Sequence, residues 1–347
     1  MAKINLHSRW SPPSEWDRIR VIDAHTEGEP LRVILNGFPQ PHGTTILARR
    51  RYARQWQNHL RQALMWEPRG HADMYGCLIT PAATAEADFG VLFLHNEGFS
   101  TMCGHGIIAV TTVVLETGML AMHTPETTVR IDTPAGLVVA QATVEGRRVT
   151  DVRFRNVPSF VLSLDRKTDV PGLGAVAYDI AFGGAFYAFV QAEAFGLKLR
   201  PEATRDLIDV GMKIKSAVSE SQPITHPFDQ DLGFLYGTIF IGPPVLEGSH
   251  SRNVCVFAEG EVDRSPTGTG VSARLALHHK RGEIKPGEQI VIESIIGTTF
   301  RGSVAETTTC GPYEAVVPEV CGTAHITGTG EMLLDPGDPL RHGFLLR

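Results

Sequence analysis

The chain has 347 residues, enough for about two domains of ordinary size. Hydrophobic residues make up 42 % and charged residues 20 % of it, so it can form packed cores and lacks the composition of a disordered chain. Its 32 Lys and Arg against 38 Asp and Glu give a net charge of −6, which argues against binding to nucleic acids or acidic membranes.

No apolar run approaches the roughly 18–20 residues that cross a bilayer, and the first residues contain no export signal, so the expected location is the cytoplasm. The cysteines are odd in number and include no Cys-x-x-Cys pair, which argues against a disulfide framework and a zinc ribbon. At least one thiol must therefore be free or used in chemistry. The cysteines are Cys77, Cys103, Cys255, Cys310 and Cys321.

Five short segments of the first half are rich in β-branched residues and end at Gly, Pro or Thr, which predicts strands. They are 20–25, 76–80, 90–95, 128–133 and 136–144.

Helical periodicity is clearest over 45–64, where an apolar stripe that includes Trp56 predicts one amphipathic helix. In a chain of negative net charge, the arginines of this stretch predict a solvated face rather than a basic docking site. They are Arg49, Arg50, Arg51, Arg54 and Arg61.

The second half repeats this mixture, which predicts an α/β or α+β architecture. A helix is expected over 201–219, and the segment 157–174, with a proline near each end, is the predicted crossover between two lobes. The predicted strands are 176–181, 185–192, 235–242, 253–258 and 289–297.

The two halves also share one internal feature. Cys-Gly-His-Gly at 103–106 and Thr-Gly-Thr-Gly at 267–270 each open a helical stretch that ends at a glycine 15 residues later, at Gly118 and Gly282. Strand pairs follow both stretches, so the sequence predicts two related lobes that each present one helix N-terminus.

Free N–H groups and the helix dipole make such an N-terminus an anion site, and its glycines allow a carboxylate to approach closely. The same field would lower the pKa of Cys103 and suit it as a general base. The other four cysteines are interpreted as small buried hydrophobic residues. His105 lies near Cys103, but no further ligands follow at zinc-like spacing, so no metal site is expected. Neither Gly-rich turn has the spacing of a nucleotide loop.

Several motifs resemble those of the proline racemase superfamily, from about Ile22 to the C-terminal residues. The resemblance implies a diaminopimelate-epimerase-like fold without a cofactor: two similar lobes, each a β-sheet wrapped around a central helix, with the active site in the cleft between them. We expect a first lobe over 1–159, to which 334–347 returns, and a second lobe over 160–333. The motifs are IDAHTEGEPLR at 22–32, EPRGH at 67–71, HNEG at 95–98, MCGHG at 102–106, LYGT at 235–238 and DRSPTGTG at 263–270.

Racemases and epimerases of this superfamily carry a catalytic cysteine at both helix N-termini, one on each face of the substrate α-carbon. Thr267 stands at the second position here, and its hydroxyl is too weak an acid to exchange protons near neutral pH. Cysteine in the first motif with threonine in the second resembles the subgroup that dehydrates trans-3-hydroxy-L-proline. This implies a hydro-lyase of hydroxyproline catabolism that forms Δ1-pyrroline-2-carboxylate and water, with Cys103 as the single base for the α-proton.

In trans-3-hydroxy-L-proline the hydroxyl and the α-hydrogen lie on the same ring face, so one base on that face can begin a syn elimination. Either the Cys103 thiol or His105 would then give a proton to the departing oxygen, and the sequence leaves both open.

The resemblance also assigns substrate contacts. Asp263 would bind the ring ammonium, with a helix cap as its alternative role, and Phe257 would form an apolar wall, with core packing as its alternative. Tyr75 would line the opposite side. Thr267 is either a bystander or a hydrogen-bond partner of the substrate. Backbone donors to the carboxylate would come from Gly104, His105, Gly268 and Thr269.

Two rival interpretations remain. One is a 4-hydroxyproline 2-epimerase or proline racemase that tolerates Thr267, and the other is a catalytically silent amino-acid-binding protein, which would have no use for Cys103. The expected partner is a small imino acid, with neither nucleic acid nor membrane involved. The sequence leaves the oligomeric state open, including a homodimer.

Overall fold

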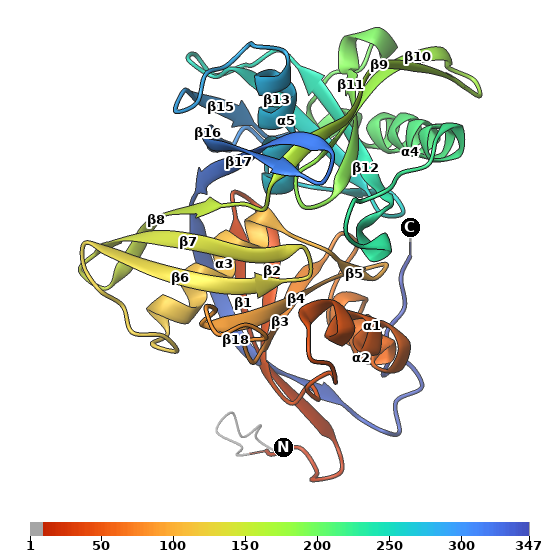
Figure 1. Ribbon diagram of the computed structural model, residues 1–347. Helices are drawn as coiled ribbons and strands as arrows, with labels where there is room; N and C mark the ends of the chain where they lie inside the picture. The colour runs from red at the N-terminus through yellow and green to blue at the C-terminus, as the bar shows by residue number, and fades with distance from the viewer. Residues whose placement is uncertain (1–9, 347) are drawn as a thin grey trace.

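The structure is a computed structural model and describes residues 10–346 (Figure 1). Its first lobe contains α1 (Ile46–Trp56), α2 (Asn58–Met65), α3 (Gly104–Glu116), β1 (Asp17–Thr26), β2 (Glu29–Asn36), β3 (Tyr75–Thr80), β4 (Phe89–His95), β5 (Phe99–Ser100), β6 (Glu126–Thr133), β7 (Gly136–Glu145), β8 (Arg148–Arg155) and β18 (Ala324–Leu334).

The second lobe holds the helices α4 and α5 and the strands β9 to β17 (Figure 1). The elements are α4 (Thr204–Ser221), α5 (Gly268–Lys280), the 3-10 turns η1 (Ala192–Phe195), η2 (Pro201–Ala203) and η3 (Gln230–Leu232), β9 (Ser159–Val170), β10 (Gly174–Phe182), β11 (Phe186–Gln191), β12 (Leu235–Gly242), β13 (Ser251–Phe257), β14 (Glu261–Val262), β15 (Gln289–Glu293), β16 (Thr299–Cys310) and β17 (Tyr313–Gly322).

The two lobes repeat one strand topology. In the first lobe β2 runs parallel to β3, β4 pairs antiparallel with β3 and parallel with β6, and β6, β7 and β8 form an antiparallel meander. The second lobe repeats these pairings in the same order. There β11, β12, β13, β15, β16 and β17 take the places of β2, β3, β4, β6, β7 and β8. The expected fold of two similar lobes is therefore confirmed.

Strand pairing joins the lobes and sets where the chain crosses between them. β17 of the second lobe pairs with β8 of the first, and β18 then runs antiparallel to β1, from Thr26 opposite Ala324 to Asp17 opposite Leu334. The chain thus returns to the first lobe at Ala324, ten residues before the return expected at 334.

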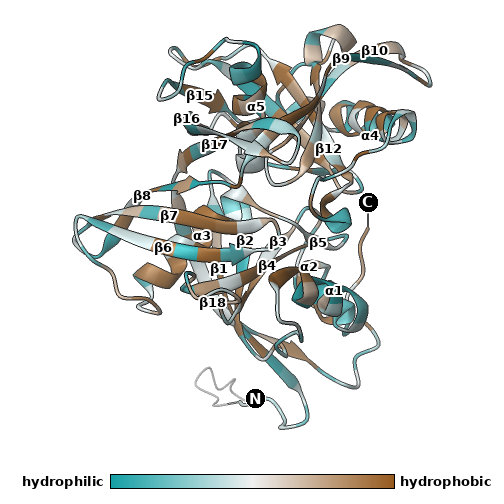
Figure 2. Ribbon diagram, viewed as in Figure 1, coloured by the Kyte–Doolittle hydropathy of each residue, from teal (hydrophilic) through white to brown (hydrophobic). Residues whose placement is uncertain are grey.

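α3 and α5 are the central helices of their lobes (Figure 1). Nearly every residue of both is buried, and the strands around them carry long hydrophobic stretches, whereas α1 presents hydrophilic residues (Figure 2). A helix that is buried on all sides needs neutral or apolar residues around its whole circumference, which the buried residues of α3 supply. α5 also buries one charged residue, Arg274, whose guanidinium donates hydrogen bonds to Ser251 Oγ at 2.6 Å and to Asn253 Oδ1 at 2.9 Å. Gly118 and Gly282 follow the two helices with φ of 73° and 70°, as predicted for glycine C-caps.

The predicted helix over 45–64 is two helices. Gln57 separates α1 from α2, with φ −120° and ψ 11°. Its buried side-chain amide donates a hydrogen bond to the Pro39 carbonyl at 2.8 Å. This tertiary contact coincides with the break, although the apolar periodicity continues through it.

The predicted solvated face is only partly present, because Arg51 and Arg54 are exposed while other arginines of these helices are buried. Arg50 and Arg61 are only 6 % and 2 % exposed. Arg50 Nε donates to the Phe99 carbonyl at 2.9 Å, and Arg61 Nη1 donates to the His95 carbonyl at 2.8 Å, so backbone oxygens satisfy the buried guanidinium groups. Trp56, predicted in the apolar stripe, is instead 60 % exposed.

The other strand and helix predictions hold with two changes. Most of the segment 157–174 is β9, which forms a hairpin with β10, so the chain crosses between the lobes only at the start of this segment, between Arg155 and Ser159. Its prolines lie just outside the strand, at Pro158 and Pro171, where they cost no ladder hydrogen bond. The strand predicted over 289–297 is shorter and ends at Glu293.

Within residues 10–346, no helix has both the length and the apolar character that crossing a membrane requires.

Candidate active site

The N-termini of α3 and α5 meet at the boundary between the lobes. A Cβ atom on Gly104 would lie 2.6 Å from the Cα of Gly268, and one on Gly268 would lie 2.7 Å from the Cα of Gly104. Only glycine at both positions permits this approach. It brings together two positive dipole ends and their free first-turn N–H groups, an arrangement that a carboxylate would stabilise.

A small cavity lies at this junction. All nine residues predicted for the site line it, together with three that were not predicted, Met102, Tyr187 and Tyr236. The nine are Tyr75, Cys103, Gly104, His105, Phe257, Asp263, Thr267, Gly268 and Thr269. Residues from both lobes thus form one enclosure.

Cys103 is the N-cap of α3. Its Sγ accepts a hydrogen bond from the N–H of Gly106 at 3.2 Å, and the side chain is 4 % exposed. Burial raises the pKa of the thiol well above its ordinary value, and the carboxylates of Asp263 and Glu29 raise it further, despite the opposing hydrogen bond from Gly106. The lowered pKa expected from the helix end is therefore wrong, because desolvation of this buried thiol outweighs the helix field.

His105 lies directly beside this thiol. Its Nδ1 is 3.3 Å from Cys103 Sγ, and burial lowers the pKa of the imidazole. A hydrogen bond to the Pro30 backbone and the donation of Thr26 Oγ1 to the His105 carbonyl at 2.8 Å hold the residue in place. Burial thus favours the neutral thiol and the neutral imidazole.

Thr267 is the N-cap of α5 and the counterpart of Cys103, but it caps differently. Its side chain makes no capping hydrogen bond, and its φ of 68° is unusual for a β-branched residue. The side chain is 5 % exposed, and the buried Oγ1 has only the thiol of Cys255, a weak hydrogen-bonding group, as its partner among the described residues. A buried hydroxyl left in this way is available to a ligand.

Asp263 does not cap α5. Its Oδ1 accepts the N–H of Ser265 at 2.7 Å, within the turn before the helix, and the carboxyl group is 4 % exposed. Glu29 of the first lobe accepts the N–H of Arg264 at 2.7 Å, one residue from Asp263. Burial and the nearby charge of Asp263 raise the pKa of Glu29 well above its ordinary value. Asp263, which lines the cavity, therefore has a second buried acid beside it, Glu29 of the other lobe, which does not line the cavity.

Three lining residues were missed. Met102 lies in the MCGHG motif and Tyr236 in the LYGT motif. Both motifs carry the family resemblance, but neither indicates that these two residues line the cavity. Tyr187 lies on β11 with no local motif, and its hydroxyl is 2.7 Å from Thr269 Oγ1. Only the fold brings this tyrosine from its strand to the helix end.

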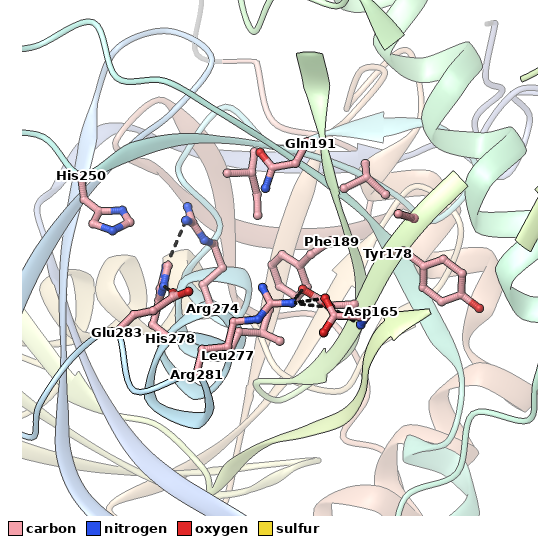
Figure 3. A pocket seen from close by; sticks show the side chains of 14 residues that line it. Asp165, Tyr178, Phe189, Gln191, His250, Arg274, Leu277, His278, Arg281 and Glu283 are labelled. Atoms are coloured by element: carbon pink, nitrogen blue, oxygen red, sulfur yellow. Dashed lines mark hydrogen bonds and ion pairs between the residues drawn. The ribbon is translucent and has the colours of Figure 1, made fainter. Parts of the chain in front are cut away.

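A larger cavity lies at the opposite, C-terminal end of α5 (Figure 3). Its charged groups pair with one another: Arg281 contacts Asp165 at 2.8 Å, and His278 lies between Arg274 and Glu283. None of the predicted site residues lines it. Among residues 10–346, no group of three or more His, Cys, Asp or Glu side chains is arranged to hold a metal ion.

Comparison with known proteins gives the following similarities. A family model described as proline racemase matches residues 21–345. A trans-3-hydroxy-L-proline dehydratase from Colwellia psychrerythraea is 48 % identical over 342 residues, which cover 98 % of this chain and 96 % of the relative. The Homo sapiens trans-3-hydroxy-L-proline dehydratase is 47 % identical over 335 residues, 95 % of each chain. A solved hydroxyproline epimerase from Agrobacterium vitis, with bound trans-4-OH-L-proline, has a TM-score of 0.92 at 34 % identity and 96 % coverage of each chain.

Proposed function

Because the chain belongs to the proline racemase family, we propose that it dehydrates trans-3-hydroxy-L-proline to Δ1-pyrroline-2-carboxylate and water. The observation that carries this proposal is the asymmetry of the cavity, which has a thiol at one helix N-terminus, Cys103, and a hydroxyl at the other, Thr267. The names of the bacterial and human relatives support the same substrate.

In this proposal the substrate carboxylate binds the free N–H groups where α3 and α5 begin, which neutralises charge that opposes removal of the α-proton. The ring ammonium binds Asp263, and Phe257 packs against the apolar face of the ring. The ammonium also brings a positive charge close to Cys103, and an opposite charge favours the thiolate. Substrate binding would thus offset the effect of burial, which raises the pKa of the Cys103 thiol.

Cys103 then removes the α-proton, and the electron pair at the α-carbon expels the hydroxyl from the neighbouring carbon on the same face. The resulting enamine tautomerises to Δ1-pyrroline-2-carboxylate. Thr267 cannot return a proton from the opposite face near neutral pH, because an alcohol is far too weak an acid. Its buried Oγ1, which has the weak thiol of Cys255 as its partner, would instead hydrogen bond to the substrate.

Incubation with three substrates in parallel tests this function. Trans-3-hydroxy-L-proline should give Δ1-pyrroline-2-carboxylate, whereas trans-4-hydroxy-L-proline and L-proline should come back with their configuration unchanged on chiral chromatography. Epimerisation of either of these two without dehydration of the first would support the epimerase or racemase alternative. Binding of all three without turnover would support a silent binding protein.

The location that fits this function is the cytoplasm. All five cysteines are buried free thiols, a state that a reducing compartment maintains. Cell fractionation with an antibody to the chain tests this placement, and recovery from an oxidising compartment would contradict it.

A further inference from the structure

Three tyrosines line the cavity that holds the thiol of Cys103. Tyr75 on β3 comes from the first lobe, and Tyr187 on β11 and Tyr236 on β12 come from the second. All three line the cavity and are at most 7 % exposed. So many buried phenols around one thiol need a reason beyond packing, because each hydroxyl must find a partner there.

Two of these tyrosines form a hydrogen-bonded chain that begins at the thiol. The Tyr75 hydroxyl contacts Cys103 Sγ and donates a hydrogen bond to Ser100 Oγ at 2.5 Å, and its oxygen lies 3.3 Å from that of Tyr236. Tyr187 is outside this chain, since its hydroxyl pairs with Thr269. The chain therefore runs from Cys103 through Tyr75 to Tyr236, and it crosses from one lobe to the other.

Ring packing fixes the direction of both hydroxyls. The Tyr75 ring meets the ring of His105 edge-on at 4.8 Å, and the Tyr236 ring stacks on Phe257 at 5.3 Å and 30°. Burial raises the pKa of both phenols well above the ordinary value, so they stay protonated near neutral pH. A neutral hydroxyl can accept one proton while it gives up another.

We infer that Cys103, Tyr75 and Tyr236 form a proton relay that carries the substrate's α-proton to its departing hydroxyl. The inference rests on the proposed function. It adds a third way to protonate the departing oxygen. The sequence leaves two others open, direct return of the proton by the Cys103 thiol and donation by His105.

The relay balances without an external proton. The Cys103 thiolate takes the α-proton, a double bond forms between the α-carbon and the neighbouring carbon, and the C–O bond breaks with its electron pair on oxygen. Tyr236 gives its proton to that oxygen, the Tyr75 hydroxyl turns from Ser100 and gives its proton to Tyr236, and the Cys103 thiol gives its proton to Tyr75. Water leaves, both phenols are again protonated, and the thiolate is restored.

The substitution Tyr236→Phe removes the donor at the substrate end and keeps the ring. Loss of a positioned proton donor costs about 10²- to 10⁴-fold, so kcat for dehydration should fall within that range. Removal of the α-proton does not need Tyr236 and should be slowed less. In D2O the ratio of deuterium incorporated at the α-carbon of recovered substrate to product formed should therefore rise above the wild-type ratio.

A better leaving group gives an independent readout. Fluoride needs less protonation than hydroxide on departure, so Tyr236→Phe should lose less rate with trans-3-fluoro-L-proline than with the hydroxy substrate. Tyr75→Phe interrupts the same chain in its middle and should also raise the exchange-to-dehydration ratio, which provides a second variant should the first fail to fold.

Two matched variants serve as controls. Tyr187→Phe removes a cavity hydroxyl outside the chain and should leave the ratio at the wild-type value, and Tyr178→Phe removes one whose hydroxyl contacts Ser221, away from the cavity. The relay would be overturned if Tyr236→Phe slowed exchange and dehydration equally, or slowed neither of them. It would also be overturned if Tyr187→Phe raised the exchange-to-dehydration ratio as much as Tyr236→Phe does. Failure of the wild-type protein to dehydrate trans-3-hydroxy-L-proline would instead overturn the proposed function, and this is measured separately.

Discussion

The contact between the two central helices makes Gly268→Ala the most informative single substitution. The added Cβ would lie 2.7 Å from the Cα of Gly104, whereas ordinary contacts begin at 3.4 Å, so the facing backbone must retreat by 3.4 − 2.7 = 0.7 Å. The neighbouring atoms are backbone, which cannot rotate away as a flexible side chain could. The strain must therefore separate the two helix N-termini.

The size of the effect follows from that displacement. Overpacking of a core costs about 1–3 kcal/mol, and the higher helix propensity of alanine returns at most about 1 kcal/mol. We expect a net loss of about 1–2 kcal/mol in the free energy of unfolding. The loss of activity should be larger in proportion, because a misplacement of about 1 Å in a catalytic geometry can cost about 100-fold. A 10- to 100-fold fall in kcat/KM for trans-3-hydroxy-L-proline is therefore expected.

Urea unfolding followed by circular dichroism gives the stability, and steady-state kinetics gives kcat/KM. Gly330→Ala is the matched control, because a Cβ on this strand glycine has no neighbour within 4 Å. Its stability should stay within about 0.5 kcal/mol of the wild type, with unchanged kinetics. Wild-type kcat/KM in a folded Gly268→Ala protein would refute the reasoning that the helix contact aligns the site.

The remaining predictions concern the two helix caps. Cys103→Ser should lower dehydration at least about 100-fold without unfolding the protein, and substantial residual turnover would remove Cys103 from the position of base. Thr267→Cys should introduce α-proton exchange from the second face, seen as epimerised substrate, whereas a folded variant without exchange would show that the two caps do not flank the α-carbon. Because burial raises the pKa of Cys103 and the thiolate is the active form, kcat/KM should fall as pH decreases and should still be rising above about pH 8.5. A flat profile across the neutral and mildly alkaline range would contradict this assignment.

The two helix N-termini of the site could be predicted, because local sequence patterns mark them. Cys103 and Thr267 open helices whose glycine caps lie at equal spacing, and both the capping and the repeat depend on neighbouring residues only. Asp263 and Phe257 entered the predicted site through motif resemblance, and the structure brings them to the same cavity. Sequence reasoning thus identified both helix ends and most of the residues around them.

What could not be predicted depends on partners distant in the chain. Arg61 is buried because the carbonyl of His95, 34 residues away, accepts from it, and no periodicity shows such a partner. Tyr187 and Tyr236 reach the cavity through strand pairing in the second lobe. The direction of the Cys103 pKa was wrong for the same reason, since the sequence shows the helix end but not how completely the surrounding side chains exclude water.

The central claim is that one thiol, acting on a single face of the ring, removes the α-proton and expels a hydroxyl from that same face. Dehydration rates for trans-3-hydroxy-L-proline and cis-3-hydroxy-L-proline, compared under identical conditions, test it most directly, because the two isomers differ only in the face that carries the leaving group. The account predicts rapid release of Δ1-pyrroline-2-carboxylate from the trans isomer and little or none from the cis isomer. Comparable rates for both would contradict it.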